Sequence, residues 1–114
     1  MTEFSYQLYS SRNFPPLSST LKMLGSLGYR QVEGYGGLFA NPDAIEELKG
    51  NLSANGLTMP TGHVGFDMVR DQPDRVLEIA GALGMEAIFV PAVGPDERTK
   101  DAAGWRAFGE QLAA

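Results

Sequence analysis

The chain has 114 residues, of which 14 are acidic and 9 basic, so its formal net charge is −5, and it contains no cysteine. This charge argues against binding to nucleic-acid backbones or anionic membranes, since both need a basic face. The lack of cysteine excludes disulfides and thiolate sites and fits a cytoplasmic protein, and no stretch approaches the ~20 apolar residues of a membrane span.

The first unit runs from an alternating segment to an amphipathic one. Alternation over residues 4–9 predicts a strand with Phe4, Tyr6 and Leu8 on one side. The proline pair at 15–16 suits a helix start. Leucines then recur at helical spacing, which predicts a buried stripe consisting of Leu17, Leu21, Leu24 and Leu27.

The second unit has the clearest helix start in the chain. A strand is predicted over residues 30–35 and ends at the glycine pair 36–37. Asn41 is a good N-cap and Pro42 suits the first helical position. The buried stripe of this helix is predicted to be Ile45, Leu48 and Leu52.

The third unit contains the single histidine. Residues 57–66 read as a strand that runs into a loop, and Pro60 predicts a bulge or a strand start because proline cannot donate to a sheet ladder. A polar loop is expected over residues 67–72, followed by a helix that begins near Pro73. Its predicted apolar face consists of Val76, Leu77, Ala80 and Leu83.

The fourth unit begins with an almost wholly apolar run at residues 87–93, which is typical of a strand covered on both faces. A charged loop over residues 94–101 precedes a last helix. Trp105, Phe108 and Leu112 recur in it at helical spacing and are expected in the core or an interface.

A repeat of 28 residues relates these units. Gly28, Gly56 and Gly84 each follow a helical stretch and precede a strand, as expected of glycines that end helices in the left-handed conformation. Four consecutive βα units predict an α/β fold with parallel strands, equivalent to half of an eight-unit TIM barrel, and an open three-layer sheet is the alternative. Four strands alone leave two bare edges.

In either architecture the working face lies at the carboxyl ends of the strands. The 28-residue offset places Gln7, Tyr35, His63 and Pro91 in related positions. Glu33 and Tyr9 lie within two residues of a related position, and this set of six is suited to binding a hydroxylated small molecule.

Two of these side chains are candidate catalytic groups. His63 could transfer a proton, polarise an oxygen or anchor a ligand, and Glu33 could act as a base or orient a hydroxyl. The alternatives are a structural histidine and an ion-paired glutamate, while Gln7, Tyr9 and Tyr35 either line the site or pack in the fold. Dinucleotide, P-loop and nucleophile-elbow motifs are absent from the sequence. The charged residues in loops 67–71 and 96–98 are expected to be solvated.

Four segments in order resemble the sugar phosphate isomerase/epimerase family, which has the xylose isomerase-like TIM-barrel fold. They are Gln7-Leu8-Tyr9-Ser10-Ser11-Arg12, Leu27-Gly28-Tyr29-Arg30-Gln31-Val32-Glu33, Gly62-His63-Val64-Gly65 and Ala82-Leu83-Gly84. The resemblance implies an enzyme of carbohydrate metabolism that acts on a sugar, inosose or related polyol by proton transfer next to a carbonyl. It also implies that Glu33 and His63 face the substrate.

The family resemblance further implies a bound divalent metal, whose ligands come mainly from later strands that are absent from this chain. We therefore expect residues 1–114 to form a single partial domain, the amino-terminal half of such a barrel. The chain is then a partial product, a half-barrel that pairs with another copy, or a non-catalytic binding or assembly module. A homo-oligomer, or a partner supplying the missing half, would cover the two bare edges. A DNA-repair endonuclease of the same superfamily is disfavoured by the charge.

Overall fold

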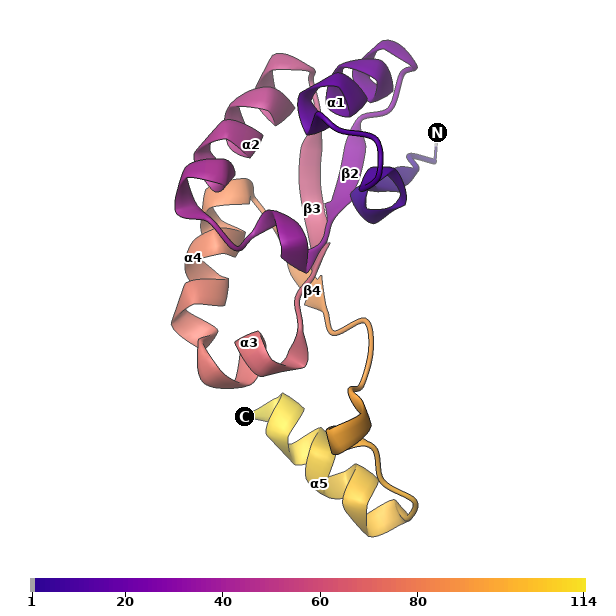
Figure 1. The fold of residues 1–114 in the computed structure, drawn as a ribbon, viewed down its shortest axis with the longest axis vertical. Coiled ribbons are helices and arrows are strands. Elements are labelled where there is room, and N and C mark those ends of the chain that lie inside the picture. The colour runs from indigo at the N-terminus through magenta and orange to yellow at the C-terminus, as the bar shows by residue number, and fades with distance from the viewer. Residues whose placement is uncertain (1) are drawn as a thin grey trace.

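The computed structural model describes residues 2–114, so the prediction for Met1 as part of the domain lies outside the described residues. Strands and helices alternate along the chain (Figure 1). The strands are β1 (Ser5–Gln7), β2 (Gln31–Gly34), β3 (Thr58–His63) and β4 (Ala87–Phe89). The α-helices are α1 (Leu17–Ser26), α2 (Pro42–Ala54), α3 (Phe66–Asp71), α4 (Pro73–Leu83) and α5 (Ala102–Ala113). The short 3-10 helices are η1 (Leu8–Ser11), η2 (Gly36–Leu38) and η3 (Pro95–Glu97).

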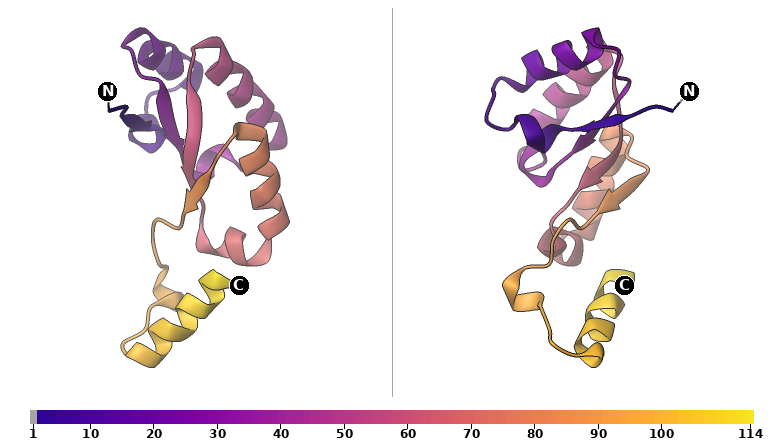
Figure 2. Two further views of the ribbon diagram at one scale, coloured as in Figure 1. Left: turned by 180° about the vertical axis from the view of Figure 1, so that it is seen from behind. Right: turned by 90° about the vertical axis from the view of Figure 1, so that its right-hand side faces the viewer.

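The strands form one parallel sheet in the order β1-β2-β3-β4. This order confirms the predicted α/β fold with four parallel strands in a half-barrel arrangement. Each strand is joined to the next by a helical crossover, and α1, α2 and α4 lie together on one side of the sheet (Figures 1 and 2).

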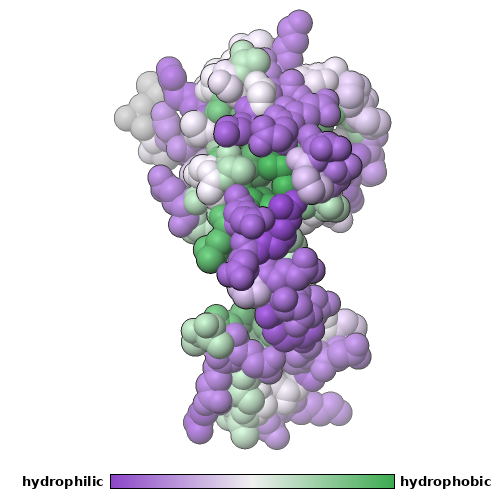
Figure 3. Space-filling model, turned by 90° about the vertical axis from the view of Figure 1, so that its left-hand side faces the viewer, coloured by the Kyte–Doolittle hydropathy of each residue, from purple (hydrophilic) through white to green (hydrophobic). Residues whose placement is uncertain are grey.

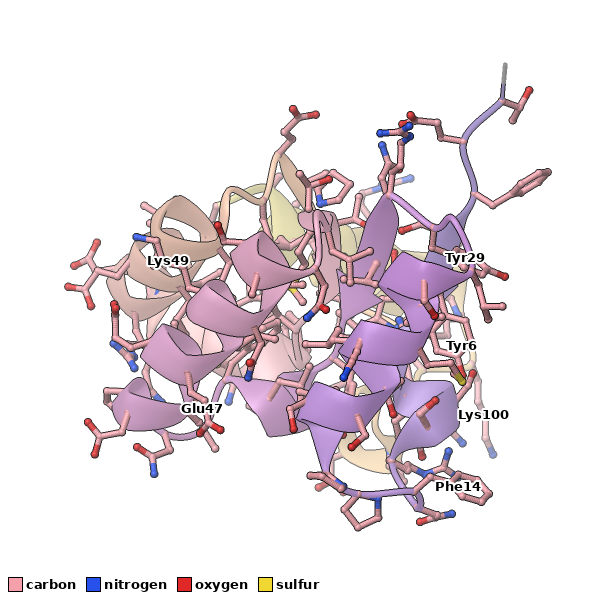
Figure 4. All side chains as sticks on the ribbon, turned by 90° about the horizontal axis from the view of Figure 1, so that it is seen from above. Tyr6, Phe14, Tyr29, Glu47, Lys49 and Lys100 are labelled. Atoms are coloured by element: carbon pink, nitrogen blue, oxygen red, sulfur yellow. The ribbon has the colours of Figure 1, made fainter. Side chains whose placement is uncertain are left out.

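The hydrophobic core lies between the sheet and those three helices. The strands contribute Val32 and Met59 to it, both almost fully buried. The predicted stripe of α2 is confirmed, because Ile45, Leu48 and Leu52 are all in this core. Tyr6 and Tyr29 meet edge to face beside α1, and Figure 4 shows the two rings on the same side of the molecule.

The opposite face of the sheet has no helical cover, and we call it the open face. None of its side chains is buried. They come from alternate positions along the strands, namely Ser5, Gln7, Gln31, Glu33, Thr58, Thr61, His63, Ala87 and Phe89. This corrects the expectation that the fourth strand is covered on both faces: Phe89, for example, is 50% exposed.

The three glycines of the repeat adopt the left-handed conformation that the sequence predicts. Their φ angles are +92° at Gly28, +66° at Gly56 and +74° at Gly84, and no other residue between 2 and 114 has a positive φ. A side chain with a Cβ is strained in this conformation, so glycine is the natural choice where the chain turns from a helix into the next strand.

Pro60 produces the predicted irregularity in β3. Gln31 of β2 pairs with Thr58, but Glu33, two residues further on, pairs with Thr61, three residues further on. The extra residue in β3 is the count that defines a β-bulge. The Pro60 carbonyl accepts a hydrogen bond from the amide of Glu86 at 2.7 Å, so the bulge remains tied to the strand on its other side.

Two predicted boundaries are wrong. Residues 67–72 were expected to form a loop, but residues 66–71 form α3, because Phe66 is buried and anchors the first turn. The fourth strand was expected over residues 87–93, but only residues 87–89 pair with β3. Two residues further on, Pro91 has no backbone N–H to donate, so it cannot extend the hydrogen-bond ladder of the strand.

Some predicted apolar stripes are also displaced. Leu77 is 69% exposed, whereas Ile79 is buried, because positions 76, 79 and 83 share one face of α4 and position 77 lies about 100° away. Leu27 is 67% exposed because α1 ends one residue before it. Phe4 is likewise exposed, since it precedes β1 and has no strand or helix beside it to cover it.

Helix α5 projects from the rest of the molecule. Its contact with the body includes Phe108, whose ring centroid lies 4.8 Å from that of Phe66 in α3. Of the three apolar residues predicted for this helix, only Phe108 is buried, and Trp105 and Leu112 are each 44% exposed. The Cα radius of gyration is 15.7 Å, against about 13 Å for a compact domain of this length. Figure 3 shows the waist between the two parts.

Candidate functional site

The carboxyl ends of three neighbouring strands bring polar side chains together on the open face. Gln7 is the last residue of β1 and pairs in register with Glu33 of β2. Glu33 pairs in turn with Thr61 of β3, and His63 ends β3 two residues later, on the same face. The strand register therefore places these four side chains next to one another.

The Glu33 carboxylate is the centre of this group. Its Oε1 accepts a hydrogen bond from Gln7 Nε2 at 2.7 Å and lies 3.0 Å from His63 Nε2. Its Oε2 accepts from the hydroxyl of Thr61 at 2.7 Å. Both oxygens thus accept a hydrogen bond, one from Gln7 and one from Thr61, and hydrogen bonds to a carboxylate are among the stronger ones in proteins.

Gln7 is itself fixed at both ends of its amide. Its Oε1 accepts from the amide of Tyr9 at 3.0 Å, which caps η1. Its Nε2 also lies 3.4 Å from the carbonyl of Gly34. Because the amide oxygen is held by the backbone, the amide nitrogen is directed toward Glu33.

His63 is the more accessible member of the pair it forms with Glu33. Its side chain is 32% exposed, against 20% for Glu33. Its ring meets Phe89 of β4 edge to face at 6.4 Å. None of the hydrogen bonds found within residues 2–114 uses His63 Nδ1, which leaves this ring nitrogen available to a ligand.

Two tyrosines and an arginine stand together just beyond β1 and β2. The rings of Tyr9 and Tyr35 meet edge to face at 5.4 Å. The guanidinium carbon of Arg12 lies 3.8 Å from the centroid of Tyr9, and Arg12 Nη1 donates to the carbonyl of Tyr9 at 2.9 Å. Tyr9 is half-exposed, so its ring and the Arg12 guanidinium form an accessible surface two residues beyond Gln7.

The 28-residue offset locates the site only approximately. The register aligns Gln7 with Glu33 and not with Tyr35, and Pro91 lies exposed beyond β4. Thr61 was missed, although it stands one repeat after Glu33 and its hydroxyl completes the set of donors. Phe89 was missed too, although it stands one repeat after Thr61, and Arg12 was missed because it lies at no offset position.

The loop charges expected to be solvated are mostly exposed, and four of them also form an ion-pair cluster. Arg70 lies 2.7 Å from Asp71, 3.3 Å from Asp67 and 3.1 Å from Glu97, so it links α3 to η3. The hydrogen bond from Arg70 lowers the pKa of Asp71 below its ordinary value, against a smaller opposing effect of desolvation, and the positive charge of Arg70 lowers it further. These side chains remain partly exposed, so the cluster contributes little to stability.

The residues present do not make up a metal centre. Among residues 2–114 there is no group of three or more His, Cys, Asp or Glu side chains placed to hold an ion. Glu33 and His63 could supply two ligands, but both Glu33 oxygens already accept hydrogen bonds.

The site is an open surface and not an enclosed pocket. A cavity of about 270 Å³ lies between α1, η2 and α2, and a groove of about 590 Å³ lies beside residues 2–4 and 27–30. Neither is lined by Gln7, Glu33 or His63. Along residues 2–114, no helix has both the length and the apolar character needed to cross a bilayer.

No protein-family model matches the sequence, and no curated protein matches it. Solved structures do match its fold. A sugar phosphate isomerase/epimerase from Parabacteroides distasonis has a TM-score of 0.75 at 15% identity, over 96% of this chain and 44% of that one. A family 2 AP endonuclease from Brucella melitensis has 0.73 at 18%, over 98% and 48%. A D-psicose 3-epimerase, solved in the presence of D-fructose, has 0.66 at 17%, over 97% and 46%.

These three proteins are xylose isomerase-like TIM barrels, so the expected resemblance is confirmed in fold. At such low identities the likeness concerns the fold alone. The chain spans less than half the length of each of the three barrels.

Proposed function

We propose that this chain is an isomerase- or epimerase-like domain that binds a sugar, inosose or related polyol and moves a proton next to its carbonyl group. The proposal rests on the contact between Glu33 and His63 at the carboxyl ends of the parallel strands. In parallel α/β barrels this end of the strands carries the chemistry. A cytoplasmic location would suit such a function and remains part of the proposal.

His63 is the proton-transfer group in this proposal, and Glu33 positions it. Both carboxylate oxygens of Glu33 already accept hydrogen bonds from Gln7 and Thr61, whereas Nδ1 of His63 is free to meet a ligand. His63 Nδ1 would take the proton from the carbon beside the carbonyl, giving an enediolate and an imidazolium. Return of that proton to the neighbouring carbon, with a hydroxyl proton passing between the two enediolate oxygens, gives isomerisation. Protonation of the same carbon by water on the opposite face, with the imidazolium returning its proton to the hydroxide so formed, gives epimerisation.

Tyr9, Tyr35 and Arg12 would hold the remainder of the ligand. The apolar face of a sugar ring packs well on an aromatic surface, and the half-exposed ring of Tyr9 offers one. The guanidinium of Arg12 could donate to hydroxyl oxygens of the same ligand. The divalent metal implied by the family resemblance would have to take ligands from outside residues 2–114.

Exchange of a carbon-bound proton with solvent tests the proposal directly. The chain is incubated in D₂O with a panel of ketoses and inososes, with and without a divalent metal, and deuterium incorporation is followed by NMR. We expect incorporation with at least one member of the panel and a loss of about 10²-fold or more in His63→Ala. Glu46→Gln, which changes an exposed carboxylate of α2, is the matched control and should keep the full rate. Absence of exchange across the panel would overturn autonomous catalysis.

A non-catalytic binding module is the second candidate, and the unenclosed site favours it. Water reaches an open surface, whereas catalysis next to a carbonyl usually requires a site from which water is excluded. This candidate predicts saturable binding of a polyol in calorimetry without exchange, and binding that falls when Tyr9 is changed to Ala.

The fold is shared with an AP endonuclease, so DNA is the ligand to test against both candidates. With a net charge of −5, we expect no salt-dependent binding of abasic duplex DNA at physiological salt. Tight binding with a steep salt dependence would contradict the proposed sugar-type function.

A further inference from the structure

Both edges of the sheet are unpaired. Within the described residues, β1 pairs only with β2 and β4 only with β3. The Phe89 carbonyl accepts from the amide of Val64, so strand alternation turns the backbone N–H and C=O of Ile88 toward the free edge. An unpaired edge of this kind is a template for another strand.

An exposed apolar side chain accompanies the β4 edge. Phe89, half-exposed, lies on the open face at the end of β4. Phe4 and Leu27, 73% and 67% exposed, line a groove across the amino ends of β1 and β2. Two unpaired edges and a sheet face without helical cover, with Phe89 exposed on it, indicate a surface that a partner buries.

We propose that the occupant of this surface is a second copy of the chain, related by a two-fold axis that coincides with the axis of an eight-stranded barrel. Rotation by 180° about that axis keeps all strands parallel. It brings β4 of each copy beside β1 of the other, so both free edges are paired at once. Such an interface is closed and self-complementary, as two-fold symmetry requires.

The dimensions of the fold support this occupant. Four parallel strands are half of the eight that close a TIM barrel. The chain spans 44% of the isomerase/epimerase barrel and 48% of the endonuclease barrel, so two copies correspond to 88% and 96% of those chains. The helices already lie on the outer side of the sheet, which is where a barrel carries them (Figure 2).

The pairing would also complete the candidate site. The open face of each copy becomes the interior of the barrel, and each copy brings its own Glu33–His63 pair to the same mouth. The second copy supplies the wall that the open surface lacks. Each Glu33 keeps its donors Gln7 and Thr61, which offset the repulsion between the two carboxylates.

The mass of the 114-residue chain in solution tests the pairing without any measurement of activity. Light scattering and sedimentation at tens of micromolar should give 24.6 kDa, twice the 12.3 kDa of one chain. Phe89→Glu should shift the mass to 12.3 kDa with an unchanged circular dichroism spectrum, because it places a charge in the barrel interior. Leu77→Glu, on the solvent side of α4, is the matched control and should leave the dimer intact.

Cross-linking provides a second measurement, since the wild-type chain has no cysteine. A mixture of Ser5→Cys and Ala87→Cys chains treated with a short bismaleimide should give the mixed dimer at least tenfold above a mixture of Ser5→Cys and Leu77→Cys. A wild-type monomer, a dimer that survives Phe89→Glu, or equal cross-linking in the two mixtures would overturn the proposal. These outcomes do not depend on whether the chain turns over a sugar, so a failed dimer test and a failed exchange test can be told apart.

Discussion

The Oε1 atom of Glu33 and the Nε2 atom of His63 lie 3.0 Å apart on neighbouring parallel strands. Neither side chain is held by this contact alone. Glu33 also accepts from Gln7 and Thr61, and His63 rests against Phe89. The pair is therefore prearranged by four strands that belong to four successive repeats.

Replacing Glu33 with Gln should destabilise the fold. The substitution keeps the shape of the side chain, but the hydrogen bonds from Gln7 and Thr61 then lose their charged acceptor, and the Thr61 hydroxyl must turn round to accept from the new amide nitrogen. We expect a loss of about 1–3 kcal/mol in the free energy of unfolding, measured by urea denaturation at neutral pH. Glu46→Gln on the exposed side of α2 should change it by less than about 0.5 kcal/mol. Equal effects at the two positions would show that the donors do not depend on the carboxylate.

Two glycines should respond to alanine in opposite directions. Gly84 has a φ of +74°, so Gly84→Ala should cost about 1–2 kcal/mol although there is free space around it. Gly50 lies inside α2 with open space around it, so Gly50→Ala should gain about 0.5–1 kcal/mol. Thermal and urea unfolding of the two variants check both signs, and a loss of stability in Gly50→Ala would contradict the assignment of an unstrained helical position.

The hydrogen bond from Arg70 lowers the pKa of Asp71 in the folded state. The ordinary pKa of this carboxyl, 3.8, applies to the unfolded chain, and the pKa in the folded chain is lower. The Arg70–Asp71 contact therefore stabilises the fold at pH values above 3.8. This stabilisation is lost as the pH falls below 3.8 through the folded-state pKa. Arg70→Gln should raise the pKa of Asp71 toward its ordinary value, measured by NMR titration of the carboxyl carbon. Arg75→Gln, which breaks the exposed pair with Glu78, should leave the titration of Asp71 unchanged.

Phe108→Ala should loosen α5 without unfolding the sheet. Phe108 is the buried residue of this helix, and its ring packs on Phe66 of α3. We expect hydrogen exchange of the α5 amides to accelerate at least tenfold, or about 1.4 kcal/mol, while the amides of β2 and β3 keep their protection. Leu112→Ala, at an exposed position of the same helix, is the control. Equal acceleration throughout the chain would show instead that α5 and the sheet unfold together.

Local signals in the sequence predicted most of the fold. The spacing of Gly28, Gly56 and Gly84 located three helix ends, and Asn41 caps α2 through a hydrogen bond to the amide of Asp43 at 2.9 Å. Pro60 located the bulge. These features depend on backbone geometry within a few residues, which composition and spacing report well.

The predictions fail where the position of a residue depends on its neighbours in the folded chain and not on the local sequence. The apolar run after residue 86 has the composition of a central strand, but β4 lies at an edge with one face uncovered, and no periodicity reveals that. The candidate site likewise has residues that the local sequence predicts and residues that depend on strand pairing. Glu33 and His63 could be chosen by their places at strand ends, but the contribution of Thr61 depends on the register between β2 and β3.

The extra residue at Pro60 sets the reading frame of the site. After Thr58 a regular strand would turn residues 60 and 62 to the open face, whereas the bulge turns residues 61 and 63 there. If β3 kept all of its residues but paired without the bulge, Thr61 and His63 would turn into the helical core and Gly62 would turn out of it. One extra residue in β3 thus determines which of its side chains face the candidate site and which pack in the core.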